Sequence, residues 1–136
     1  MSFIIWNKSL LMGIEEIDEQ HKELIGIINK VHSYYPGNKI AEIESLIDRL
    51  TEFARIHFST EEKYFEKWNY PYADEHMVEH EKILLKILQF KAKSEKYTKE
   101  LLNEILKFLK DEWFENHLKK HDRKYSNYFK LHGFIK

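Results

Sequence analysis

Residues 39–67, KIAEIESLIDRLTEFARIHFSTEEKYFEK, carry the pattern that decides the fold. Apolar side chains recur there every three or four residues, which is the period of an amphipathic α-helix with one buried face. They are Ile43, Leu46, Ile47, Leu50, Phe53 and Ala54. His57 and Glu61 continue the same face, because residues four apart lie side by side on a helix. This stretch therefore predicts a long helix that turns an imidazole and a carboxylate toward the core.

The same period recurs in other parts of the chain, and no stretch shows the alternation of a β-strand. Two prolines, Pro36 beside Gly37 and Pro71 after Tyr70, interrupt the periodic stretches. Short connections between long amphipathic helices favour antiparallel neighbours, so we expect an all-α, up-down-up-down four-helix bundle. The helices are expected near residues 19–35, 39–67, 73–92 and 97–118, with a turn at Lys93–Lys96 and a short C-terminal helical piece toward Phe129. The first ~17 residues read as an irregular N-terminal arm with Gly13 as a flexible point.

Length and composition limit the possible classes of protein. We interpret residues 1–136 as one domain, with 43% hydrophobic and 33% charged residues and a net charge of -1. The scattered basic residues argue against a nucleic-acid-binding face. The absence of cysteine excludes disulfides, thiolate metal sites and a cysteine nucleophile. No apolar run resembles a signal peptide or reaches the ~20 residues of a membrane span, so we expect a soluble, cytoplasmic protein.

The chain has eight histidines, which is unusual for its length. Several of them lie with carboxylates on the apolar faces of the expected helices. Buried imidazoles and carboxylates cost several kcal/mol each unless they are paired or bind metal. Seven donors are too many for one tetrahedral zinc but suit two metal ions with carboxylate bridges, although imidazole alone does not select the metal. The candidate donors are His21, His57, Glu61, His76, His80, His117 and Asp122.

One candidate donor does not fit an ideal helix. Asp122 follows His117 by five residues, which is about 140° around the axis, so the two side chains would not face one point. His121, four residues after His117, would fit better. Either the helix ends or widens here, as a π-bulge does at functional sites, or the donor is not Asp122.

The arrangement resembles the hemerythrin family, including its bacterial and archaeal single-domain members. The resemblance runs from Trp6 to about Phe129 and is specific because several motifs occur in order at family-like separations. They are Gly13-Ile14, IDEQHKELI at 17–25, HFSTEE at 57–62, Tyr70-Pro71, HMVEH at 76–80 and WFENHLKKHD at 113–122. The resemblance implies a four-helix bundle that holds two iron ions with an oxo or hydroxo bridge and binds dioxygen reversibly.

The resemblance also implies a role for each donor. His76, His80 and His117 would hold one iron, and His21 and His57 would hold a second iron that keeps an open position for dioxygen. Glu61 and Asp122 would bridge the two ions, so the family pattern prefers Asp122 over His121. Phe114 takes a place where the family usually has a leucine lining the oxygen pocket, and a phenyl ring there would narrow that pocket.

Other polar residues have less specific interpretations. Asp18 is either a helix N-cap or a partner that orients His21, and the two readings are equally supported. We expect Tyr125 to be a packed bundle tyrosine rather than a hydrogen-bond donor to the site. The remaining unmatched histidines are expected at the surface or in packing: His32, His121 and His132.

Sequence also separates classes of function. Carboxylate-rich diiron enzymes need Glu-x-x-His, which this chain lacks, and it lacks the H-E-x-x-H of zinc hydrolases. Ser-His-Asp catalysis has no strand–turn–helix elbow here. We therefore expect a dioxygen-binding protein rather than an enzyme, acting in oxygen carriage, storage or delivery, with an oxygen or redox sensor or an oxygen scavenger as the alternative. A client oxidase or oxygenase is a possible partner, and the protein is expected to be a monomer or a homo-oligomer.

Overall fold

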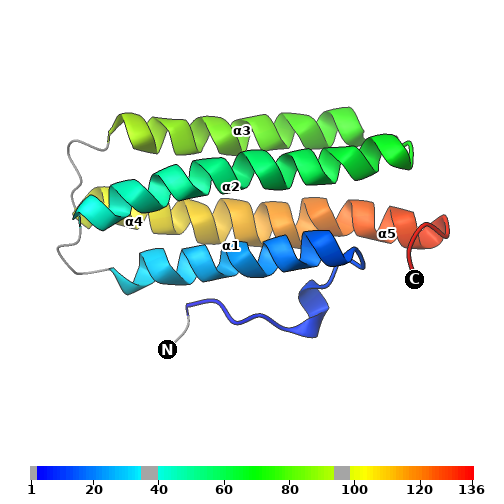
Figure 1. The fold of residues 1–136 in the computed structure, drawn as a ribbon, viewed down its shortest axis with the longest axis horizontal. Coiled ribbons are helices and arrows are strands. Elements are labelled where there is room, and N and C mark those ends of the chain that lie inside the picture. Colours follow the sequence, from blue (N-terminus) through cyan, green and yellow to red (C-terminus); the bar gives the residue numbers. More distant parts are fainter. Residues whose placement is uncertain (1–2, 35–39, 94–98) are drawn as a thin grey trace.

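The structure, a computed structural model, describes residues 3–34, 40–93 and 99–136. Its helices are α1 (Glu15–Ser33), α2 (Ile40–Lys67), α3 (Ala73–Ala92), α4 (Lys99–Lys107), the π-helix η3 (Phe108–Asp122) and α5 (Arg123–Leu131). The last three follow one another without a break and form one long helical segment. The chain thus has four helical segments within the described residues, and they lie side by side with alternating direction (Figure 1). The predicted all-α four-helix bundle is confirmed, and none of the described residues forms a strand.

Helix bounds agree with the predicted ranges except at two places. Helix α1 begins at Glu15 rather than near residue 19, so the arm is shorter than expected. The fourth helix does not stop near residue 118, because η3 continues directly into α5. The break at Pro36 and Gly37 and most of the expected turn at Lys93–Lys96 lie outside the described residues. No helix within the described ranges combines the length and the hydropathy that a membrane span requires.

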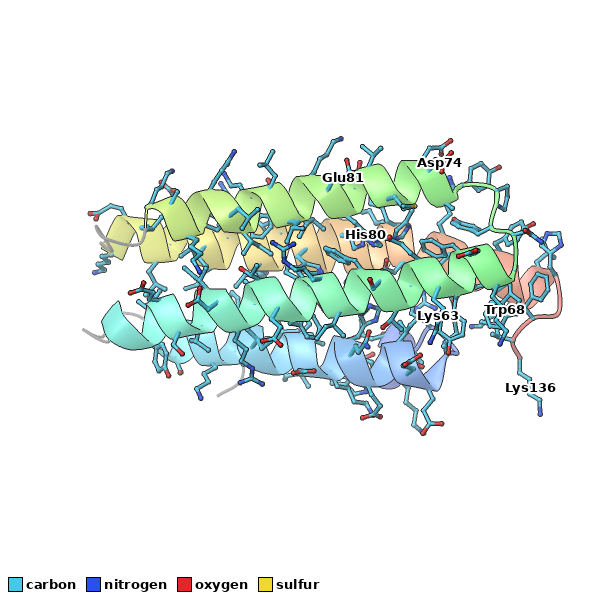
Figure 2. The ribbon with its side chains drawn as sticks, turned by 45° about the horizontal axis from the view of Figure 1, so that its top comes forward. Lys63, Trp68, Asp74, His80, Glu81 and Lys136 are labelled. Carbon is cyan, nitrogen blue, oxygen red and sulfur yellow. The ribbon has the colours of Figure 1, made fainter. Side chains whose placement is uncertain are left out.

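The core forms because each helical segment turns its apolar stripe toward the bundle axis. Leu24, Ile28, Ile87 and Leu109 are all fully buried, and they come from α1, α3 and η3. Figure 2 shows the resulting alternation on α3, where His80 lies between the helices and its neighbour Glu81 lies at the surface. Polar side chains that enter this core are therefore surrounded by packed apolar side chains.

The N-terminal arm is fixed to the bundle by side chains that bind its backbone. It contains the short helix η1 (Lys8–Leu10) and lies alongside α1 (Figure 1). The Asn29 side chain accepts from the Ile4 amide at 2.8 Å and donates to the Ile4 carbonyl at 2.9 Å. At the other end, Ser126 Oγ donates to the Met12 carbonyl at 2.6 Å. The arm is therefore an ordered part of the fold, although most of it is irregular in secondary structure.

Gly13 is a required turn rather than the flexible point that we expected. Its φ of +92° lies in a region that L side chains rarely adopt. A Cβ atom at this position would also lie 2.9 Å from Ile135 Cδ1. Glycine therefore allows the arm to turn into α1 while packing against the C-terminal segment.

Asp18 holds this turn, and neither of its two predicted roles is correct. Its Oδ1 accepts from the Met12 amide at 2.7 Å and its Oδ2 accepts from the Gly13 amide at 3.3 Å. The N-cap of α1 is Ile14, and His21 Nδ1 has no hydrogen-bond partner among the described residues. The carboxylate instead satisfies two backbone donors at the junction between arm and helix.

Replacing Asp18 by alanine should lower the free energy of unfolding by about 1–3 kcal/mol, because the buried Met12 amide loses its acceptor. Denaturant unfolding at fixed metal content measures this. The matched control is Glu19→Ala, which removes an exposed carboxylate paired with Lys22 and should change stability by less than about 0.5 kcal/mol. Equal losses in both variants would show that the carboxylate does not hold the arm.

Candidate metal centre

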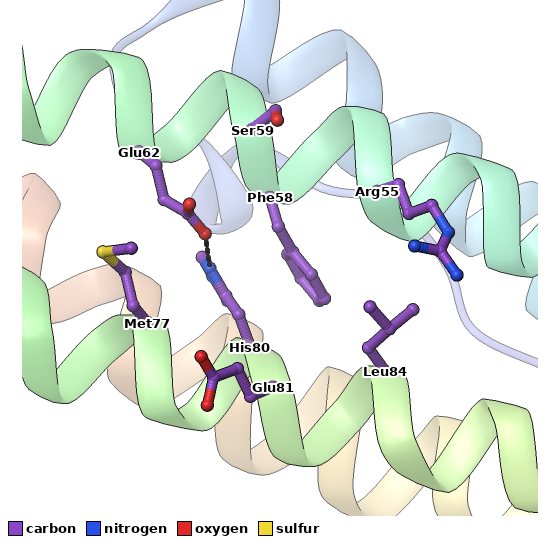
Figure 3. Close-up of a pocket in the computed structure, with 8 residues that line it drawn as sticks. All are labelled: Arg55, Phe58, Ser59, Glu62, Met77, His80, Glu81 and Leu84. Carbon is purple, nitrogen blue, oxygen red and sulfur yellow. Dashed lines mark hydrogen bonds and ion pairs between the residues drawn. The ribbon is translucent and has the colours of Figure 1, made fainter.

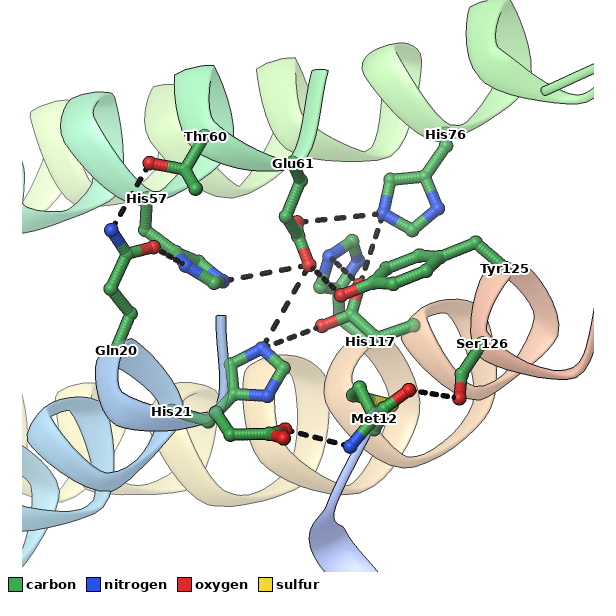
Figure 4. Close-up of polar contacts among 12 residues, drawn as sticks. Met12, Gln20, His21, His57, Thr60, Glu61, His76, His117, Tyr125 and Ser126 are labelled. Carbon is green, nitrogen blue, oxygen red and sulfur yellow. Dashed lines mark hydrogen bonds and ion pairs between the residues drawn. The ribbon is translucent and has the colours of Figure 1, made fainter. Parts of the chain in front are cut away.

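Side chains from all four helical segments converge inside the bundle. His21 comes from α1, and two donors come from each of α2, α3 and η3. All seven sequence-predicted donors are buried, with exposed fractions between 0% and 4%. They are His21, His57, Glu61, His76, His80, His117 and Asp122. Figure 4 labels five of them, His21, His57, Glu61, His76 and His117, and shows their polar contacts. The structure thus brings together the whole predicted set.

The donor atoms form two overlapping groups, each suited to a metal ion. Within each group, all donor atoms lie within 4.8 Å of one another. Glu61 and Asp122 belong to both groups. The larger group adds His76, His80 and His117, and the smaller group adds His21 and His57. Two groups that share two carboxylates have the composition of a two-metal site with carboxylate bridges.

Short contacts within the cluster do not amount to hydrogen bonds. His80 Nε2 lies 2.9 Å from Glu61 Oε1, and His76 Nε2 lies 3.0 Å from Asp122 Oδ1. Nevertheless, Nε2 of all five histidines, Glu61 Oε1 and both Asp122 oxygens have no partner in hydrogen-bond geometry. Buried polar atoms rarely stay unpaired in folded proteins. Atoms that lie close together without pairing are suited to share a cation, so the residues fit a metal centre.

Electrostatics keep the two carboxylates ionised. Burial alone would raise the pKa of Asp122, but the surrounding imidazoles, above all that of His117, lower it well below its usual range. Burial and Asp122 would raise the pKa of Glu61, but the neighbouring histidines lower it. Burial would lower the pKa of His76, but the two carboxylates raise it to about 10. The carboxylates thus attract positive charge, which protons or a metal ion can supply.

The π-helix η3 answers the question of spacing between His117 and Asp122. Its hydrogen bonds run from residue i to i+5, so residues five apart lie on nearly the same face. Of the alternatives that the sequence left open, the structure shows the widened helix, and Asp122 enters the cluster with no exposed surface. His121 lies beside the cluster, with its ring centroid 5.7 Å from that of His117, and belongs to neither donor group.

A chain of hydrogen bonds orients His57. The Thr60 hydroxyl donates to the Ile56 carbonyl at 2.9 Å, so its oxygen is available to accept from Gln20 Nε2 at 3.1 Å. Gln20 Oε1 is then left to accept from His57 Nδ1 at 2.6 Å. With its proton on Nδ1, His57 presents the lone pair of Nε2 to the cluster. Sequence reasoning missed Gln20 and Thr60, although Gln20 directly precedes a candidate donor.

Two further residues contact the donors from outside the set. Tyr125 donates its hydroxyl proton to Glu61 Oε2 at 2.6 Å, so the prediction of mere packing was wrong. The pKa of this buried phenol is raised well above its usual value by burial and by the nearby carboxylates. Glu62 lies 2.9 Å from His80 Nδ1. Sequence reasoning missed the role of Glu62, since a second glutamate beside Glu61 looks like an ordinary surface residue.

Aromatic rings flank the cluster. Phe58 stacks on His80 at 3.9 Å between centroids, and Phe53 stacks on His57 at 5.5 Å. Trp113 is fully buried and contacts both phenylalanines. Phe114 is buried on η3, with Lys119 Nζ 5.7 Å from its ring centroid. That Phe114 lines an oxygen pocket stays a prediction.

Comparison with known proteins identifies a family. The model of a family described as hemerythrin HHE cation binding domain matches residues 12–129. The chain is 26% identical to a bacteriohemerythrin of Stenotrophomonas maltophilia over 97% of this chain and 85% of the relative. It is 30% identical to a bacteriohemerythrin of Clostridium acetobutylicum over 89% of this chain and 97% of the relative. A solved wild-type hemerythrin matches with a TM-score of 0.78 at 22% identity, covering 93% of this chain and 97% of that chain, which bears on the fold alone.

Metal binding by variants at residues 121 and 122 separates the two rival donors. Asp122→Asn keeps the side-chain size but removes the shared charge, so it should lower the metal-to-chain ratio after reconstitution with ferrous or cobaltous ion. His121→Ala should leave that ratio unchanged, because His121 lies outside both donor groups. Elemental analysis of folded protein, checked by circular dichroism, measures both. Loss of metal in His121→Ala but not in Asp122→Asn would show that His121, and not Asp122, is the donor.

Proposed function

The chain belongs to the hemerythrin family, and from this we propose that its buried cluster holds two iron ions that bind dioxygen reversibly. The observation that carries the proposal is the pair of donor groups that share Glu61 and Asp122. One metal ion would need only one group, whereas two groups with common carboxylates suit two ions held close together. An imidazole-rich set with two carboxylates is compatible with iron.

The proposed ligand assignment follows the two groups. His76, His80 and His117 would hold one iron, and His21 and His57 would hold the other. Glu61 and Asp122 would bridge them. The second group has one imidazole fewer than the first, so it leaves room for dioxygen to bind. A pair of ferrous ions supplies the two electrons that reversible dioxygen binding needs.

The protein's own residues would keep this binding reversible by excluding water and anions. Phe53 lies against the His57 imidazole on α2, Phe58 lies against the His80 imidazole on α3, and Trp113 contacts both phenyl rings. These rings are less than 7% exposed. An apolar wall keeps protons away from bound dioxygen. It therefore slows the release of that dioxygen in a reduced form. This environment supports oxygen carriage, storage or delivery ahead of sensing or scavenging.

Iron content and gas exchange test the proposal directly. Protein reconstituted anaerobically with ferrous iron should contain about two iron ions per chain and little zinc. Its optical spectrum should change on exposure to air and return under vacuum over several cycles. An iron content of one or none would contradict the two-iron site. A spectral change that vacuum does not reverse would leave the site intact but replace the carrier role by scavenging or a redox role.

Variants of Phe114 test the proposed oxygen pocket. Phe114→Leu should widen the pocket and speed dioxygen exchange, and Phe114→Ala should speed irreversible oxidation further by admitting water and anions. Stopped-flow uptake and spectral decay in air measure the two rates. Phe134→Ala is the control, since Phe134 is 42% exposed and stacks on Trp68 instead of lying in the core. Unchanged rates in both Phe114 variants would place the pocket elsewhere.

A further inference from the structure

Four of the five donor histidines show different surroundings for Nδ1, the ring nitrogen that does not face the cluster. His80 Nδ1 lies 2.9 Å from a carboxylate oxygen of Glu62. His57 Nδ1 lies 2.6 Å from the amide oxygen of Gln20. Nδ1 of His21 and His117 has no hydrogen-bond partner within the described part of the chain. Among the described contacts, therefore, a carboxylate lies behind His80 of the larger donor group, whereas a neutral amide lies behind His57 of the smaller group.

The difference between a carboxylate and an amide matters for the metal. An ionised carboxylate can only accept, so His80 Nδ1 must carry the proton and donate it to Glu62. His80 Nε2 is then a lone-pair donor that faces the cluster. A carboxylate that accepts from a ligating histidine also raises the basicity of that imidazole. A neutral amide in the same place has a much smaller effect. The same geometry that orients His80 thus brings extra negative charge to one metal position.

Glu62 is placed so that it can keep this charge. It lines a surface hollow of about 350 Å³ between α2 and α3, together with Arg55, Ser59 and Glu81 (Figure 3). The Glu62 side chain is 31% exposed, whereas that of His80 is 3% exposed. Solvent can therefore stabilise the Glu62 carboxylate, while its hydrogen bond reaches a buried ligand.

We propose that Glu62 is a positioning residue that acts through His80 to lower the reduction potential of the metal position formed by His76, His80 and His117. The added negative charge stabilises the higher oxidation state at that position more than the lower one. Gln20 orients His57 on the other side without adding charge, so the two metal positions are electronically unequal. This inference rests on the proposed two-iron function and adds a control over its electron affinity.

The decisive variant is Glu62→Gln, whose amide oxygen can still accept from His80 Nδ1 but carries no charge. Its midpoint potential should rise while its iron content stays at the wild-type value. Glu81→Gln is the matched control, because the exposed Glu81 side chain lines the same hollow but makes no hydrogen bond or ion pair with a donor histidine among the described contacts. Its potential should stay unchanged. Equal shifts in both variants, or no shift in Glu62→Gln, would overturn the proposal.

Glu62→Ala and zinc binding separate orientation from charge and from the redox role. Glu62→Ala removes both the acceptor and the charge, so it should also lose iron. Zinc(II) affinity, measured by chelator competition, should fall about tenfold in Glu62→Gln and stay constant in Glu81→Gln. Zinc undergoes no redox change, so this measurement decides the role of Glu62 even if the protein does not bind an iron pair. Unchanged zinc affinity together with an unchanged potential would leave Glu62 no role at the site.

Discussion

The burial of two ionised carboxylates is the constraint on which the rest of this structure depends. Glu61 and Asp122 have no exposed surface, and each has at least one oxygen without a hydrogen-bond partner. An uncompensated buried charge costs several kcal/mol, which is a large part of the stability of a small protein. Each helical segment meets this cost by bringing at least one imidazole to the carboxylates. The packing that brings the four segments together therefore also assembles the donor groups that suit a cation.

The unusual winding of η3 follows from the same constraint. A regular α-helix would turn Asp122 about 140° away from His117 and leave one shared carboxylate outside the cluster. The π-helix brings both side chains to the same face. π-Helical winding is rare in proteins and is frequent at functional sites. The winding of η3 therefore allows Asp122 to join the donor group that contains His117.

Residues around the donors form an outer layer that is as specific as the donors themselves. Gln20 reaches from α1 to His57 on α2, and Glu62 reaches from α2 to His80 on α3. Tyr125 connects α5 to Glu61. Each contact fixes a ring or a carboxylate and also joins two helical segments. The outer layer therefore couples the stability of the bundle to the geometry of the candidate metal centre.

The sequence by itself determined the helical class, the approximate helix ranges and the convergence of seven donors, because a helical period of 3.6 residues converts spacing into a shared face. It left Asp122 and His121 as alternative donors, because spacing in the sequence does not show whether the backbone winds as an α-helix or a π-helix. Only the tertiary structure placed Asp18 at the arm, Gln20 behind His57 and Glu62 behind His80. These contacts join side chains on different segments, or a side chain to a backbone turn. They depend on how the segments pack against one another, and the hydrophobic period of a single helix gives no information on that packing.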